Sequence, residues 1–281
     1  MSWHKEQQGF VTFAQNTDTV DYLELAYAQA LNIKATQQEN RYAVIVDAAT
    51  KEKLNENHYN VFDYIIDIPN DDNDPSGLRK FANEWKVFHL TPFKETIKLE
   101  SDLLFTRSID HWWTAFRLKN ICLSTGCKNY LGINSTIRKY RELFDANNLP
   151  DVYNGLMYFR FSQESHDFFE AAKYIQANWE YVRTGLKNCI EEQPSTDVLY
   201  ALAALMAGEE TVTMPSMDFL NFVHLKPAIN GVDEPVTDRL LTEFDQGMIR
   251  INNINQLQPL HYFEKDFVTE EMKEWYGSRI S

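Results

Sequence analysis

The sequence has 281 residues, of which 44% are apolar and 24% are charged, a composition typical of a folded globular protein rather than a disordered or fibrous one. Its 41 acidic residues outnumber its 27 basic residues, which gives a formal net charge of −14. A chain this acidic has no general attraction for nucleic acid or for an anionic membrane. A polyanionic partner would therefore need a local cationic patch or a bound metal.

Cysteine usage and the N-terminal segment bear on the cellular compartment. Cys122, Cys127 and Cys189 lack the spacings of a zinc site or of a disulfide framework, which favours a reducing compartment. The first residues lack the apolar core of a signal peptide, and no run of about 18 apolar residues occurs. We therefore expect a cytoplasmic protein with no membrane partner.

The first part of the chain alternates predicted strands and helices. Residues 9–14 form a short apolar run, which is followed by a polar loop and then by a helical pattern at 20–31. Nearly continuous apolar runs at 42–47 and 64–68 are typical of parallel strands that are covered on both faces. Because α/β proteins bind ligands at the carboxyl ends of such strands, this half of the chain predicts a site for a nucleotide-like ligand.

The next segments contain a loop and a strand that carries acids. Residues 70–77 are rich in turn formers and predict a solvated loop, and residues 78–88 have helical character. Residues 96–105 are predicted to form one strand, which Glu100 and Asp102 interrupt. Two acids in an apolar stretch are costly to bury unless a cation meets them.

The second half predicts further strands and helices. Residues 153–161 indicate a turn feeding an alternating strand, and a long amphipathic helix should follow, with Phe168, Ala172, Ile175, Trp179 and Val182 on one stripe. A helix at 196–207 has Ser195 as a predicted N-cap and Gly208 as a stop signal, and a weaker helix is expected at 269–276. No linker divides the chain, so we expect one α/β domain at 1–230 and a C-terminal extension at 231–281 that packs on the domain or on a partner subunit.

The acid pair is the sharpest chemical feature. At positions i and i+2 of an extended segment, Glu100 and Asp102 would lie on one side of the strand and offer an oxygen-rich corner to Mn²⁺ or Mg²⁺. An exposed edge strand with two solvated acids would give the same local pattern. His224 and Lys226 end a second apolar run, where the imidazole could ligate the metal and the ammonium could meet a phosphate. A histidine in this position could equally be a hydrogen-bonded packing residue.

From Gly9 to Pro227 these segments resemble, in order, the glycogenin-like nucleotide-sugar glycosyltransferases of the GT-A fold. The resemblance rests on the nucleoside-side loop, the Asp-x-Asp-like acid pair with Ile109-Asp110 after it, the acceptor-side strand and the closing His segment, found here at 12–14 with Tyr22, 97–104, 153–158 and 223–227. Trp85-Lys86 stands in for the family's Thr-Lys. Glu replaces the first Asp of the acid pair, and Val198-Leu199 follows Asp197 in place of Gln-Gly.

The resemblance implies a single Rossmann-like GT-A domain with a mixed, mainly parallel central sheet. It implies transfer of a sugar, with retention, from a nucleoside-diphosphate sugar to a hydroxyl of a saccharide, a protein or a hydroxymethylated DNA base. The implied metal ligands are Glu100, Asp102 and His224, and the implied residues beside the reacting sugar are Asn154 and Asp197. The donor-binding residues would be Thr12, Phe13, Ala14, Tyr22, Lys86, Ser101 and Lys226.

Several alternatives stay open at this point. For a DNA acceptor, the basic residues Lys128, Arg138, Lys139 and Arg141 could contact phosphates, although a solvated helix face is the preferred interpretation. Trp112, Trp113 and Phe116 could stack on a sugar, but aromatic residues at helical spacing favour the core. A sugar-nucleotide-forming nucleotidyltransferase is the second candidate function, weakened by the absence of glycine at 13–17. A non-catalytic binding protein on the same fold is the third. The aromatic extension could also cover a partner subunit in a homodimer.

Overall fold

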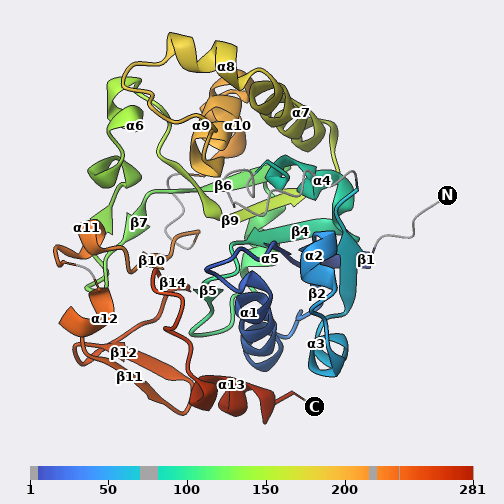
Figure 1. Cartoon of the computed structure of the whole chain (residues 1–281), viewed down its shortest axis with the longest axis vertical. Helices are drawn as coiled ribbons and strands as arrows, with labels where there is room; N and C mark the ends of the chain where they lie inside the picture. The colour runs from blue at the N-terminus through green and yellow to red at the C-terminus, as the bar shows by residue number, and fades with distance from the viewer. Residues whose placement is uncertain (1–5, 70–81, 215–219, 234, 281) are drawn as a thin grey trace.

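The computed structural model describes residues 6–69, 82–214, 220–233 and 235–280. The loop expected at 70–77 and the first part of the helical segment expected at 78–88 lie outside these residues. The described chain is a mixed α/β structure with three sheets, and helices lie on both sides of the largest one (Figure 1). The expected fold class is confirmed.

The largest sheet has six strands in the order β3-β2-β1-β4-β9-β6. The first four are parallel, and β9 is antiparallel to both of its neighbours. All residues of β2 are buried, as expected for a parallel strand covered on both faces. The bounds are β1 Glu6–Ala14, β2 Tyr42–Val46, β3 Tyr64–Asp67, β4 Phe93–Leu99, β6 Ile121–Thr125 and β9 Val152–Arg160.

Two smaller sheets are built largely from the second half of the chain. One has the order β5-β14-β10-β7-β8, and β14 in it pairs parallel with β10 and antiparallel with β5. The other is the antiparallel sheet β11-β12-β13. Their bounds are β5 Leu103–Leu104, β7 Cys127–Lys128, β8 Asn134–Ser135, β10 Val223–His224, β11 Thr242–Asp245, β12 Met248–Ile251, β13 Ile254–Asn255 and β14 Leu260–His261.

Helices cover the two sides of the central sheet. In Figure 1, α7, α9 and α10 lie above it and α1 and α13 lie below it. The α-helices are α1 Tyr22–Thr36, α2 Ala48–Lys51, α3 Glu56–Val61, α4 Val87–Leu90, α5 Trp112–Phe116, α6 Glu142–Ala146, α7 Gln163–Ala177, α8 Trp179–Val182, α9 Thr196–Ala207, α10 Glu209–Val212, α11 Pro227–Asn230, α12 Val236–Arg239 and α13 Glu270–Gly277. Short 3₁₀ helices are η1 Glu84–Lys86, η2 Ile137–Tyr140 and η3 Arg183–Gly185. None of the helices among the described residues has the length and apolar content needed to cross a bilayer.

The predicted helix at 196–207, with its caps, and the predicted helix near the C-terminus are both present. Ser195 caps α9, since its hydroxyl accepts a hydrogen bond from the Val198 N–H at 3.4 Å, and Gly208 ends that helix with a φ of 87°. The weak helix expected near the C-terminus is α13, capped by Thr269. It packs against α1, and the Lys273 ammonium lies 2.5 Å from the Glu24 carboxylate.

The core contains aromatic side chains and thiols. Trp112, Trp113 and Phe116 are at most 3% exposed, so their assignment to the core is confirmed. Cys122 and Cys127 are buried free thiols.

Two strand predictions need correction. The strand expected at 96–105 ends at Leu99, and the chain turns through Glu100 and Asp102 before β5 joins another sheet. The turn expected at 153–155 is wrong, because these residues lie inside β9. Strand β9 is buried on both faces, so its sequence lacks the polar alternation that marks a half-exposed strand.

The basic cluster is not a solvated helix face. Lys128 is buried in β7, the Arg138 guanidinium donates to the Leu149 carbonyl, and the Lys139 ammonium donates to the Ile229 carbonyl at 3.3 Å. Arg141 forms an ion pair with Asp197 at 2.7 Å. Arg138, Lys139 and Arg141 thus each contact an acceptor on a neighbouring segment, and Lys128 is buried.

Gly9 provides a test of the packing between β1 and β4. A Cβ at this position would lie 2.4 Å from the Cζ atom of Phe93, whose ring is 1% exposed. We expect Gly9→Ala to lower the free energy of unfolding by about 1–3 kcal/mol through overpacking, measured by urea denaturation. Gly185→Ala is the matched control, since a Cβ there meets nothing within 4 Å and should change stability by less than about 0.5 kcal/mol. Equal stability of both variants would contradict the packing described.

Candidate active site

The acidic turn after β4 is held by backbone contacts from three directions. The Gln29 side-chain amide donates to the carbonyls of Glu100 at 2.6 Å and Leu103 at 2.7 Å. The Glu100 N–H donates to the Gly155 carbonyl at 3.0 Å, and the Tyr262 N–H donates to the Asp102 carbonyl at 3.0 Å. Because these bonds fix the backbone, the two carboxylates project from a defined turn.

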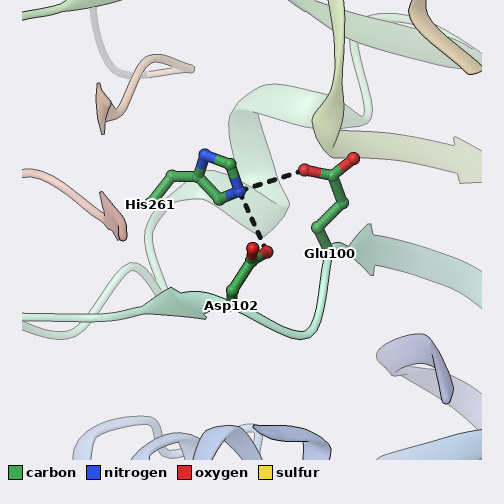
Figure 2. Close-up of side chains that lie close together, drawn as sticks. All are labelled: Glu100, Asp102 and His261. Carbon is green, nitrogen blue, oxygen red and sulfur yellow. Dashed lines mark hydrogen bonds and ion pairs between the residues drawn. The ribbon is translucent and has the colours of Figure 1, made fainter. Parts of the chain in front are cut away.

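Glu100, Asp102 and His261 form a compact cluster (Figure 2). The Nε2 atom of His261 lies 2.9 Å from Asp102 Oδ1 and 3.1 Å from Glu100 Oε2. One potential ligand atom from each residue lies within 4.8 Å of the others. Two carboxylate oxygens and an imidazole nitrogen are a donor set that suits Mn²⁺ and also accommodates Mg²⁺.

The histidine and the two acids of the cluster shift each other's pKa values. Burial would lower the pKa of His261, but the Asp102 and Glu100 carboxylates outweigh burial and raise it to about 9. Burial would raise the pKa of Asp102, but His261 and Lys265 lower it well below its usual range. Burial would also raise the pKa of Glu100, but the contact with His261 outweighs burial and lowers it. Without a metal the cluster is therefore an imidazolium between two carboxylates.

The missed residue is His261, which lies on β14 beside the expected His224 on β10. These two strands are parallel, and His224 and His261 are Cα partners in their register. The ring centroids lie 4.5 Å apart, and the two Nδ1 atoms lie 2.7 Å apart, so one Nδ1 donates a hydrogen bond to the other. Burial, followed by the nearby His261, lowers the pKa of His224 well below its usual range. His224 thus contacts His261, while His261 contacts the acids.

Most of the predicted site residues line one cavity of about 420 Å³. It opens at the carboxyl ends of β1 and β4, where α/β folds place ligands. The predicted residues that line it are Thr12, Phe13, Tyr22, Glu100, Ser101, Asp102, Asp197, His224 and Lys226. Residues that line it but were not among the predicted catalytic, donor-binding or metal-binding residues include Glu84, Tyr140, Arg141, Tyr153, His261, Phe263 and Lys265.

Two cations line the cavity near the acid pair. The Lys265 ammonium contacts Asp102 Oδ2. The Lys226 ammonium lies over the rings of Tyr140, at 4.5 Å from the centroid, and Phe263, at 5.1 Å. Both ammonium groups line the cavity, where they could pair with a phosphate group.

Asn154 and Asp197 are joined to each other. The Asn154 N–H donates to Asp197 Oδ1 at 2.9 Å, and the Asn154 side-chain amide donates to Glu100 Oε1 at 3.1 Å. Burial raises the pKa of Asp197, against the nearby guanidinium of Arg141. Asn154 is fully buried, so it supports the two carboxylates from within the sheet, whereas Asp197 lines the cavity. The lack of a side chain at Gly155 makes room for the Tyr153 ring, because a Cβ at position 155 would lie 2.3 Å from that ring.

Two predicted donor-binding residues lie elsewhere. Ala14 is fully buried and is not among the residues lining the cavity. Lys86 lines a separate surface hollow with Trp85 and donates to the Asn83 side-chain oxygen at 2.6 Å. Lys86 and Glu84 are two residues apart in a 3₁₀ helix of three residues per turn, so their side chains project in different directions. It is Glu84 that faces the cavity.

Comparison with solved structures gives the fold. A galactosyltransferase, LgtC, solved with donor and acceptor sugar analogues, matches with a TM-score of 0.52 and 12% identity over 96% of this chain and 95% of its own. The glycosyltransferase GlyE of Streptococcus pneumoniae TIGR4 matches with a TM-score of 0.53 and 9% identity over 98% of this chain and 61% of its own. The chain has the GT-A fold. No protein-family model and no curated protein sequence matches it.

The ion cluster predicts a pH dependence of stability in the metal-free protein. The His261 imidazole has a pKa of about 9 in the folded state and of about 6.5 in the unfolded state. Its ion pairs with the carboxylates therefore stabilise the fold fully below pH 6.5, and this stabilisation is lost as the pH rises towards 9. We expect the free energy of unfolding in EDTA to fall by up to about 3 kcal/mol between pH 6 and pH 9.5. His261→Gln should remove this component, as measured by urea denaturation across pH. The same pH slope in both proteins would contradict the ionised cluster.

Proposed function

We propose that this protein is a metal-dependent glycosyltransferase that moves a sugar from a nucleoside-diphosphate sugar to a hydroxyl acceptor. The observation that carries the proposal is the Glu100, Asp102 and His261 cluster, which lines the cavity at the carboxyl ends of β1 and β4. The two carboxylates and the imidazole have the chemistry of a divalent metal site. The solved structures with the same fold include a galactosyltransferase, which supports the same class of reaction.

Residues along the cavity suit successive parts of such a donor. Thr12, Phe13 and Tyr22, at the end of β1 and the start of α1, would contact the nucleoside. Lys226 and Lys265 would bind the diphosphate, since compact ammonium groups pair with phosphate oxygens. In this arrangement the sugar lies towards Asp197, which is held by Arg141 and the Asn154 N–H.

Departure of the diphosphate is the demanding step, because negative charge accumulates on the leaving group. A divalent ion held by Glu100, Asp102 and His261 would act as a Lewis acid towards that charge. Lys226 and Lys265 would add fixed positive charge in a partly water-excluded cavity. The family resemblance adds two features to the proposal. The anomeric configuration is retained, and the acceptor is a saccharide, a protein or a modified DNA base.

Thermal unfolding with a ligand panel tests the donor and the metal together. We expect a nucleoside diphosphate or its sugar nucleotide to raise the melting temperature by about 5 °C at 100 times its dissociation constant, and only with Mn²⁺ present. Asp102→Asn should abolish this increase. Asp67→Asn is the control, because Asp67 forms a solvent-exposed ion pair with Lys51 at 2.8 Å. Metal-dependent stabilisation that persists in Asp102→Asn would remove Asp102 from the site.

Reaction products separate the three candidate functions. Mn²⁺-dependent release of nucleoside diphosphate from a sugar nucleotide identifies a transferase. Release of pyrophosphate from a nucleoside triphosphate and a sugar phosphate identifies a nucleotidyltransferase. Donor binding with neither product identifies a non-catalytic binding protein and contradicts the proposal.

A further inference from the structure

Glu84 presents a buried carboxylate to the cavity at a place that the metal cluster does not use. Glu84 is 6% exposed and lines the cavity, although it belongs to the short helix η1 and not to the acidic turn. Its Oε2 atom lies 2.6 Å from the ammonium of Lys98, which is fully buried in β4. The cluster of potential metal ligands found among the described residues does not include Glu84.

Lys98 ties Glu84 to the other polar groups of the site. Its ammonium also donates to the Asn154 side-chain oxygen at 2.7 Å. Asn154 in turn donates to Glu100 at 3.1 Å and to Asp197 at 2.9 Å. The Glu84 backbone carbonyl accepts from the Tyr200 hydroxyl at 3.3 Å. Glu84 is therefore held at both backbone and side chain by buried groups, as a group that positions a ligand must be.

The second oxygen of Glu84 has chemistry suited to a hydroxyl group. Within the described part of the chain, no hydrogen bond reaches Glu84 Oε1, while Oε2 is engaged by Lys98. A carboxylate oxygen is a strong acceptor, and it repels phosphate groups. The cations that suit a diphosphate contact other residues, since Lys265 contacts Asp102 and Lys226 lies over the rings of Tyr140 and Phe263. Neutral groups that donate hydrogen bonds, such as sugar hydroxyls, are the part of a sugar nucleotide that fits Glu84.

We propose that Glu84 is a specificity-determining residue that accepts a hydrogen bond from a hydroxyl of the donor sugar, and that Lys98 positions it. This inference rests on the proposed function, because it requires a sugar nucleotide in the cavity. Glu84 thereby selects donors that carry a hydroxyl at one ring position. A donor without that hydroxyl would leave a buried carboxylate oxygen unpaired, which is the basis of strong discrimination.

Isothermal titration with matched ligands tests the role of Glu84. UDP, GDP, ADP and CDP are titrated with Mn²⁺ into wild type and Glu84→Gln, alongside UDP-glucose, UDP-galactose, GDP-mannose, ADP-glucose and CDP-glucose. We expect the substitution to weaken the preferred sugar nucleotide about tenfold and to leave its nucleoside diphosphate within about twofold. Glu95→Gln is the control, because Glu95 is a buried acid of β4 that pairs with Arg117 at 2.9 Å and does not line the cavity. It should change neither affinity.

A second variant and a second ligand set guard against a folding defect. Glu84→Gln leaves the Lys98 ammonium without its carboxylate, so the double variant E84Q/K98M removes both charges. Deoxy forms of the preferred sugar nucleotide are also compared. Wild type should lose about tenfold for one deoxy position, and Glu84→Gln should bind that deoxy donor and its parent alike.

The outcomes are distinct. Equal weakening of nucleoside diphosphate and sugar nucleotide in Glu84→Gln, no weakening of either, or a wild type that binds the two alike would overturn the role of Glu84 and leave the proposed function standing. A wild type that binds none of these ligands with Mn²⁺ would overturn the proposed function, and the role of Glu84 with it.

Discussion

The contact of His261 with Glu100 and Asp102 is the interaction on which this site depends. Asp102 and His261 are 159 residues apart in sequence, yet their side chains lie 2.9 Å apart. Two carboxylates this close would repel each other in a buried setting unless a cation lay between them. The imidazolium supplies that charge, and a divalent metal could replace its proton. The pairing of β14 with β5 and β10 brings His261 to the acidic turn.

Charge is distributed unevenly along the cavity. Glu84 and Asp197 are matched by Lys98 and Arg141, which are themselves engaged in ion pairs at 2.6 and 2.7 Å. Lys265 contacts Asp102, and Lys226 also lines the cavity, so both could offer positive charge to a diphosphate. In the proposed function, local cations and a bound metal would let a protein with a formal net charge of −14 accept a negatively charged donor.

The histidines illustrate how far local pattern reaches. His224 and His261 each end a two-residue strand, and a lysine follows each of them within four residues. Nothing in either run distinguishes a group that contacts the acids from a group that supports it. The distinction arises from the order of strands, since β14 lies between β5 and β10 and is therefore nearer to the turn that carries Asp102. The available signal was His261 itself, which is followed by the aromatic residues Tyr262 and Phe263 and then by Lys265.

The sequence by itself determined the mixed α/β class, the strands β1, β2 and β3, the capped helix α9 and the pair of acids two residues apart, because these depend on periodicity, capping and spacing over a few residues. Only the tertiary structure decided which histidine meets the acids, that the acids occupy a turn between two sheets, and that Glu84 faces the cavity in place of Lys86. Those outcomes depend on pairing between distant strands and on the direction in which a short helix presents its side chains, and neither is encoded in the neighbouring residues.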